Sequence, residues 1–315
     1  MDYFLLLIGF ILLIKGADYF VEGASSIARR LQVPTLIIGL TIVAFGTSAP
    51  EAAVSMTSAL KGHNEIAIGN IVGSNIFNLL FVVGLAAAID PLHVKRSMIL
   101  KEFPFTVLSC VVLLIMVQDQ LFEGTTEQVL SRGEGLILLL FFGIFMYYLI
   151  EVALTARKEA EKEIEGMRLG RSILGAFAGL VGVVVGGQFV VDAASAIALN
   201  LGMSQNLIGL TIVAVGTSLP ELVTSVVAAK KGESDIALGN VIGSNLFNVF
   251  FILGVSALIH PIMIDASIIV DSIFLLIVTL IAYLFAVTKK KMNRVEGSIL
   301  VGIYIIYMIL IIIRG

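Results

Sequence analysis

Residues 37–91 and 207–261 repeat each other at a constant offset of 170, without a gap. Of the 55 aligned positions, 30 are identical. A chain that carries one segment twice is expected to fold into two similar units that pack against each other. Any fold for this chain must therefore accommodate two related halves.

The chain is too apolar to cover itself with polar surface. Its 315 residues are 58% hydrophobic and 14% charged, whereas soluble domains carry about 25% charged residues. Because a bilayer core needs about 20 apolar residues per helix, we predict ten membrane spans. Their ranges are 3–28, 35–60, 66–89, 94–117, 133–155, 172–200, 205–229, 236–259, 265–287 and 295–313.

The distribution of lysine and arginine predicts the orientation, because loops rich in these residues stay in the cytoplasm. Lys15 falls inside the first span, and 16 of the other 19 basic residues follow odd-numbered spans. The exceptions are Lys61, Arg132 and Arg314. We therefore predict a multi-pass protein of the plasma membrane with both termini extracellular and the polar linker 156–171 cytoplasmic.

The two copies are five spans apart, and because five is odd they must cross the membrane in opposite directions. This predicts an all-α polytopic membrane protein made of two inverted five-helix repeats. Residues 1–155 form the first repeat, 156–171 the linker and 172–315 the second repeat. Transporters of this type hold their substrate near the midplane, where broken helices from the two halves meet.

Each copy carries Gly-Thr-Ser-x-Pro-Glu inside a predicted span, ending at Glu51 and at Glu221. Gly46 suits the end of one half-helix, and Pro50 suits the first turn of the next. Proline lacks an N–H and crowds the carbonyl four residues before it, so nearby carbonyls lose their helical partners. In lipid, such groups must be satisfied by protein, water or an ion. Free carbonyls beside a carboxylate predict a cation site.

Further oxygen-bearing residues recur at helical intervals around both motifs, so their oxygens can converge on one face. In the first copy these are Ala44, Thr47, Ser48, Glu51, Ser74 and Asn78. Their counterparts in the second copy are Ala214, Thr217, Ser218, Glu221, Ser244 and Asn248. Ca²⁺ takes 6–8 oxygen ligands, and a set without sulfur or imidazole disfavours Zn²⁺ and Cu. The sequence predicts an all-oxygen cage with two carboxylates.

Simpler roles remain open for some of these residues. A carboxylate at mid-membrane costs ~2.5–3.5 kcal/mol on insertion scales and usually marks function, which favours a functional role for both glutamates. Ser74 and Ser244 are also explained by helix packing alone. Asn75 and Asn245 point about 100° away from the neighbouring serines, and we predict that they make helix–helix hydrogen bonds.

At these motifs the chain resembles the cation/calcium exchanger superfamily, specifically its Na⁺/Ca²⁺ exchanger branch of prokaryotic calcium/sodium antiporters. Both repeats of that family carry G-T-S-x-P-E and G-S-x-x-x-N in these positions, and the resemblance covers nearly the whole chain. It implies secondary active exchange of Ca²⁺ for Na⁺ by alternating access. The expected partners are Ca²⁺, Na⁺ and the lipid bilayer, without a cofactor, and the expected functional unit is a monomer.

The resemblance also implies roles for individual residues. The central carboxylates would be Glu51 and Glu221. Carbonyl ligands would come from Ala44, Ala214, Thr47 and Thr217, with both threonines adding their hydroxyls. The flanking Na⁺ sites would be completed by Ser48, Ser74, Ser218 and Ser244. The middle of the cluster would hold Asn78 and Asn248. The second, third, seventh and eighth helices would form a bundle around the ions. The long first and sixth helices would slide across that bundle to alternate access.

Two differences from related exchangers narrow the choice of transported ions. Some members of the branch, including the K⁺-dependent ones, carry Asp where this chain has Asn248. With Asn in both repeats there is no third carboxylate, which speaks against K⁺ co-transport. Ca²⁺/H⁺ exchangers carry G-N-x-x-E, and here the Gly-Asn pairs at 69–70 and 239–240 lack that glutamate. A Ca²⁺/H⁺ antiporter stays the nearest alternative. A passive cation channel, with a continuous pore lined by oxygens, is the alternative from another class.

Other functions find no support in the sequence. It contains no phosphate-binding loop, no paired nucleophile and base, and no metal-hydrolase spacing, so an enzyme is not expected. No basic patch is interleaved with aromatic residues, so nucleic acid is not an expected partner. The single cysteine, Cys110, excludes an intramolecular disulfide.

Overall fold

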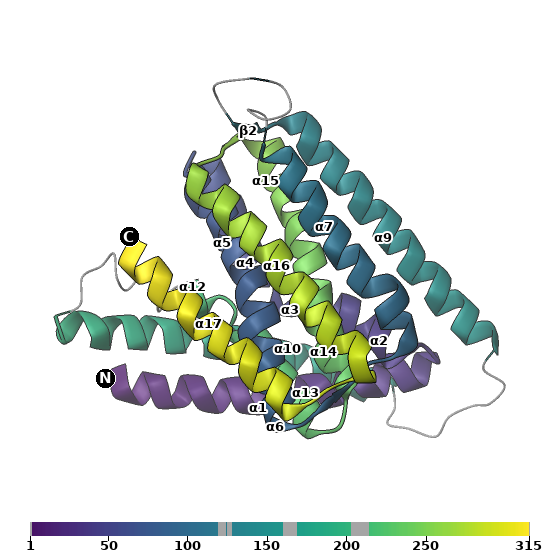
Figure 1. Ribbon diagram of the computed structural model, residues 1–315. Coiled ribbons are helices and arrows are strands. Elements are labelled where there is room, and N and C mark those ends of the chain that lie inside the picture. The colour runs from purple at the N-terminus through teal and green to yellow at the C-terminus, as the bar shows by residue number, and fades with distance from the viewer. Residues whose placement is uncertain (1, 119–123, 125–127, 160–168, 203–213, 315) are drawn as a thin grey trace.

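The computed structural model describes residues 2–118, 124, 128–159, 169–202 and 214–314, and helices dominate this part of the chain (Figure 1). Eight of its helices are long and apolar enough to cross a membrane, and a bent pair, Thr35–Thr47 with Ala49–Leu60, brings the total to nine. The remaining predicted span, 205–229, begins outside the described residues. The helical membrane fold is confirmed, and the count of ten stays a prediction.

The centre of the molecule is a bundle of broken helices from both halves, in which η marks a wider π-helical turn. The first half supplies α2 (Thr35–Ile38), η1 (Gly39–Val43), α3 (Ala44–Thr47), α4 (Ala49–Leu60), α5 (Asn64–Phe77), η2 (Asn78–Val82) and α6 (Val83–Ile89). The second half supplies α12 (Ala214–Gly216), α13 (Leu219–Lys230), α14 (Ser234–Leu246), η5 (Phe247–Leu253) and α15 (Gly254–Ile259). Burial identifies these helices as central: in α5–α6 and α14–α15, 78% of the apolar window is buried, against 17–39% in the other spans.

Four further helical segments cover this bundle and present apolar side chains outward. They are η3 (Met98–Glu102) with α7 (Phe103–Met116), α9 (Arg132–Glu159), α16 (Ala266–Lys289) and α17 (Arg294–Arg314). Large residues on their outer faces, such as Leu284 and Ile306, are mostly exposed. Apolar side chains that face outward all along a helix suit contact with lipid.

Two long helices, α1 (Asp2–Leu31) and α10 (Leu169–Asn200), lie side by side across the bottom of the bundle in Figure 1. Glycines bring their backbones together: a Cβ on Gly16 would lie 2.7 Å from the nitrogen of Val183. A Cβ on Gly179 would lie 2.6 Å from the carbonyl oxygen of Gly16. Because lipid is as apolar as the helix surface, the hydrophobic effect does not hold helices together in a membrane, and small residues at such a contact allow the close packing that does.

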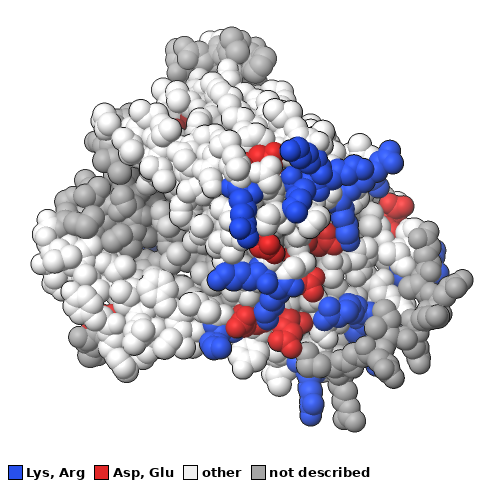
Figure 2. Space-filling view, turned by 60° about the horizontal axis from the view of Figure 1, so that its bottom comes forward, with Lys and Arg blue, Asp and Glu red and all other residues white. Residues whose placement is uncertain are grey.

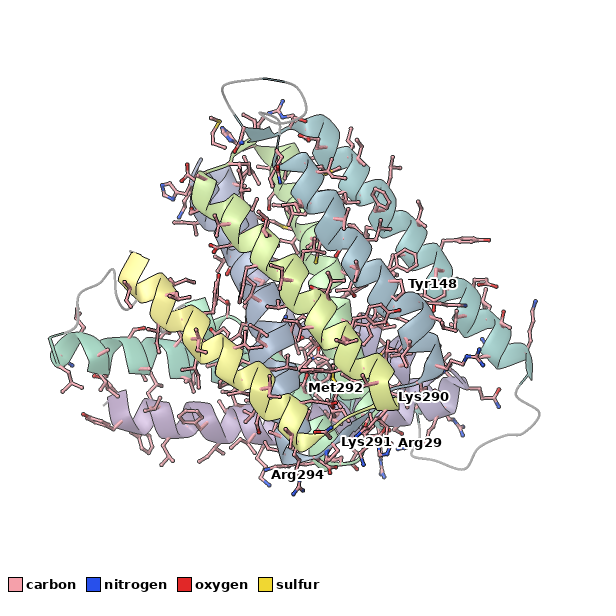
Figure 3. The ribbon with its side chains drawn as sticks, viewed as in Figure 1. Arg29, Tyr148, Lys290, Lys291, Met292 and Arg294 are labelled. Carbon is pink, nitrogen blue, oxygen red and sulfur yellow. The ribbon has the colours of Figure 1, made fainter. Side chains whose placement is uncertain are left out.

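Two short strand pairs join the halves. β1 (Leu92–His93) pairs antiparallel with β4 (Lys291–Met292), and β2 (Val129–Leu130) pairs antiparallel with β3 (Ile262–Met263). The offset of 170 carries β1 onto β3, so the same connection occurs twice. β2 lies at the top of Figure 1, whereas Lys291 and Met292 of β4 lie at the bottom of Figure 3. Equivalent connections at opposite ends are what an inverted repeat requires.

Charged side chains gather on the face that Figure 2 brings forward from the bottom of Figure 1. Arg29, Lys290, Lys291 and Arg294, which the sequence places on one side of the membrane, lie at this end of the molecule (Figure 3). The grouping agrees with the predicted topology. That this face is cytoplasmic stays a prediction.

Candidate ion-binding site

The Gly-Thr-Ser-x-Pro-Glu motif interrupts its helix, as the sequence predicts. α3 ends at Thr47, Ser48 has the non-helical angles φ −80° and ψ 7°, and α4 follows with Pro50 in its first turn. The two pieces meet at 51°. In the second half Ser218 has φ −93° and ψ 7° before α13. Proline fits the first turn because that position needs no helical N–H donor.

Gly46 lies in the last turn of its half-helix, which ends one residue later at Thr47, and its counterpart Gly216 is the last residue of α12. Gly46 also lies close to α10. A Cβ there would lie 2.9 Å from Cδ1 of Leu180 on α10. The glycine is therefore consistent both with the end of its half-helix and with the side chain of Leu180 packed against it.

Both glutamates lie in the first turn of the second half-helix, where the positive end of the helix dipole favours a negative charge. Glu51 and Glu221 are fully buried. Ser218 donates to Oε1 of Glu51 at 2.8 Å, and Ser48 donates to Oε1 of Glu221 at 2.9 Å. Each carboxylate is thus held by the serine of the other repeat, which brings both to the contact between the halves.

The other predicted serines join this cluster. Ser74 Oγ lies 3.1 Å from Ser218 Oγ. Ser244 Oγ lies 3.4 Å from both Glu221 Oε1 and the carbonyl oxygen of Ala44. All three serines are buried. The structure therefore brings these serines and the Ala44 carbonyl to the glutamates.

The threonines are placed differently. Thr47 is buried but donates its hydroxyl proton to Oδ1 of Asn240 at 2.9 Å, so only the lone pairs of that oxygen are open to a cation. Thr217 lies in the break between α12 and α13. Ala214 begins α12, and its side chain lies outside the described atoms.

Asn78 and Asn248 are fully buried, and each bonds to the opposite repeat. Nδ2 of Asn78 donates to Oδ1 of Asn245 at 3.1 Å, and Nδ2 of Asn248 donates to Oδ1 of Asn75 at 3.0 Å. Asn75 and Asn245 also donate to each other's backbone carbonyl, at 3.2 and 3.3 Å. The predicted helix–helix hydrogen bonds of Asn75 and Asn245 are confirmed.

Four oxygen atoms of predicted ligands are buried without a hydrogen-bond partner in the described part of the chain. They are Oε2 of Glu51, Oε2 of Glu221, Oδ1 of Asn78 and Oδ1 of Asn248. Buried polar atoms are nearly always bonded, and an exception calls for a reason such as an ion. All four atoms are acceptors, two belong to carboxylates, and they occur as matched pairs from the two repeats. Such a donor set suits a cation.

The character of the ligands narrows the kind of cation. Neither glutamate forms an ion pair with a basic residue among the residues described. The same residues contain no cluster of three or more His, Cys, Asp or Glu side chains, the type of cluster that holds many tightly bound metals. The only charged groups that the structure describes at the candidate site are the two glutamates. A cation bound there would meet two carboxylates and neutral oxygens, the ligands that hard cations such as Ca²⁺ prefer.

Asn70 and Asn240 are positioned to support the site, and the sequence interpretation assigns them no role there. Nδ2 of Asn70 donates to Ser55 Oγ at 2.9 Å and to the backbone carbonyl of Glu51 at 3.3 Å. The same bonds recur in the second half, with distances of 2.9 and 3.3 Å, among Asn240, Ser225 and Glu221. They tie each glutamate turn to its neighbouring helix. The available signal was their identity in both repeats, together with their spacing of four residues before Ser74 and Ser244.

Comparison with known proteins shows what the chain is similar to. The family described as sodium/calcium exchanger protein matches residues 1–151 and 171–313. The sodium/calcium exchanger MaX1 of Methanosarcina acetivorans is 32% identical, over 98% of each chain. The inner membrane protein YrbG of Escherichia coli is 34% identical, over 96% of this chain and 94% of its own.

The fold is also similar to a solved structure of the sodium-calcium exchanger NCX_Mj. The two superpose with a TM-score of 0.85 at 35% sequence identity, covering 97% of this chain and 96% of the other. Similarity over both chains almost end to end includes both repeats and the broken helices of the candidate site.

Proposed function

The chain belongs to the sodium/calcium exchanger family, and from that premise we propose that it exchanges Ca²⁺ for Na⁺ at the contact between its two repeats. Membership makes it a multi-pass membrane antiporter for Ca²⁺ and other cations, and a transporter and not an enzyme. The proposal adds Na⁺ as the driving ion and the oxygen cluster as the binding site. The observation that supports it is the set of four unpaired, buried acceptor oxygens.

We propose as ligands the twelve residues that the sequence singles out. They are Ala44, Thr47, Ser48, Glu51, Ser74, Asn78, Ala214, Thr217, Ser218, Glu221, Ser244 and Asn248. We further propose that the site lies near the membrane midplane and that a monomer is the functional unit.

The charge of the site accounts for exchange. Two buried carboxylates without a counter-charge are costly, because burial removes their hydration. One Ca²⁺ balances their formal charge of −2, and bound Na⁺ ions can replace it. Because the empty site is unfavourable, the protein switches between its outward-facing and inward-facing states most readily when the site holds Ca²⁺ or Na⁺. Movement of one ion in one direction is thereby coupled to movement of the other ion back, which distinguishes an antiporter from a channel.

Na⁺ is expected to be the coupling ion. In proteoliposomes loaded with Na⁺, an outward-directed Na⁺ gradient should drive uptake of radioactive Ca²⁺ above its equilibrium level. An imposed pH gradient without Na⁺ should not, because the sequence lacks the glutamates typical of the H⁺-coupled branch. Uptake with the pH gradient alone would replace the proposal by Ca²⁺/H⁺ exchange. Ca²⁺ equilibration without any counter-ion would indicate a channel.

K⁺ is expected to have no effect on exchange. The amide of Asn248 contributes one oxygen and no charge, so the proposed site holds two carboxylates, whereas K⁺-dependent relatives have an aspartate in this position. Na⁺-driven Ca²⁺ flux should be equal within error when K⁺ or choline balances the medium. Strong stimulation by K⁺ would show that another residue supplies a K⁺ site.

A further inference from the structure

Four asparagines connect the two halves where α5 and η2 meet α14 and η5. We propose that Asn75 and Asn245 are positioning residues, which turn the amide oxygens of Asn248 and Asn78 toward the transported cation. Neither belongs to the twelve proposed ligands. The inference rests on the proposed function, because it takes Asn78 and Asn248 as ligands.

Asn75 lies on α5, yet both ends of its amide bond to the second repeat. Its Nδ2 donates to the backbone carbonyl of Asn245 at 3.2 Å. Its Oδ1 accepts from Nδ2 of Asn248 at 3.0 Å. All three residues are at most 1% exposed. The bond to the carbonyl of Asn245 therefore fixes the orientation of the Asn75 amide. The bond from Asn248 then fixes the orientation of the Asn248 amide relative to Asn75.

The second half repeats this arrangement in reverse. Nδ2 of Asn245 donates to the backbone carbonyl of Asn75 at 3.3 Å, and its Oδ1 accepts from Nδ2 of Asn78 at 3.1 Å. Asn78 and Asn248 both lie in π-helical turns, η2 and η5, a geometry that is frequent at functional sites. The two orienting contacts are therefore a paired feature of the repeat.

The consequence lies in the chemistry of the amide group. An asparagine side chain carries an acceptor oxygen and an NH₂ donor of nearly the same size, and rotation by a half-turn exchanges them. The oxygen attracts a cation, whereas the NH₂ group repels it. Because Nδ2 of Asn248 is bonded to Asn75, its Oδ1 is left unpaired. Asn75 and Asn245 thus determine that the site receives oxygens from both amides.

A double-mutant cycle separates this role from simple packing. Loss of a group that orients a metal ligand typically costs about 10–100-fold in metal affinity, and we expect Asn75→Ala to raise the half-maximal Ca²⁺ concentration by that factor. An aspartate at position 248 would have two equivalent oxygens, so either orientation of its carboxylate offers an oxygen to the cation. In the Asn248→Asp background, Asn75→Ala should therefore change the half-maximal Ca²⁺ concentration by no more than about twofold.

The other repeat supplies the matched control. Asn75 does not bond to Asn78, so the cost of Asn75→Ala should persist in the Asn78→Asp background. Conversely, Asn78→Asp should remove the cost of Asn245→Ala, and Asn248→Asp should not. If the alanine variants do not fold, Asn75→Gln and Asn245→Gln, which keep both amide groups but displace them, serve in the same cycle.

Two measurements report on the cycle: the half-maximal Ca²⁺ concentration for exchange in proteoliposomes, and the Ca²⁺-dependent rise in Tm of the purified protein, which requires no transport. An equal cost of Asn75→Ala in all three backgrounds, or no cost at all, would overturn the positioning role. The variant Asn248→Ala tests the premise separately. Unchanged Ca²⁺ binding in that variant would remove Asn248 from the proposed site itself.

Discussion

Glu51→Gln and Glu221→Gln are each expected to abolish Ca²⁺ exchange while the protein stays folded. Glutamine keeps the shape of the side chain and can still accept the hydrogen bond from Ser218 or Ser48. It removes one of two charges that would face a divalent ion in a fully buried place. Removing one partner of a buried ion pair costs about 3–5 kcal/mol, which corresponds to at least about a hundredfold in affinity.

The measurement is Na⁺-driven Ca²⁺ flux together with the Ca²⁺-dependent shift in Tm. Glu102→Gln is the matched control, because Glu102 is also buried (1% exposed) but accepts its hydrogen bond from Tyr148 on α9 and not from a serine of the two motifs. That variant should retain exchange. Because each site glutamate is fully buried and accepts a hydrogen bond from the serine of the other repeat, both glutamine variants should fail to a similar degree. Near-normal flux in either would remove that residue from the site.

Gly179→Ala is expected to disrupt the contact between α1 and α10 and to reduce exchange strongly. The added methyl group would lie 2.6 Å from the carbonyl oxygen of Gly16 and would also meet the backbone nitrogen of Phe20. Backbone atoms cannot rotate away as side chains do, so the helices must separate. Overpacking of this kind costs about 1–3 kcal/mol, and here it outweighs the gain of about 1 kcal/mol in helix propensity from glycine to alanine.

Gly175→Ala is the control for that variant, on the same helix and one turn away. A Cβ on Gly175 meets no atom within 4 Å, so only the gain in helix propensity remains, and Tm should stay equal or rise. Lower Tm and slower Ca²⁺ flux for Gly179→Ala, with Gly175→Ala unchanged, are the expected results. Equal behaviour of the two variants would show that the close approach of α1 and α10 contributes little.

Much of this protein follows from local properties of the sequence. The length of an apolar segment decides whether it can span a bilayer, so most predicted spans agree with the helices that the structure describes. The proline and glycine of each motif act on their own backbone, so the helix breaks before Glu51 and Glu221 were predictable to within about two residues. The repeat supplied the pairing of candidate residues, because equal sequences adopt equal local structure.

Only the tertiary structure decided how those residues meet. Ser48 bonds to Glu221, 173 positions away, and not to the glutamate of its own motif. The packing of α10 places Leu180 against Gly46, and the contacts of Asn75 and Asn245 across the two halves leave the amide oxygens of Asn248 and Asn78 unpaired. Helical periodicity tells which residues share a face of one helix, but it does not tell which face of a distant helix they meet. That choice depends on the packing of all the helices together, and it determines which oxygens a cation can reach.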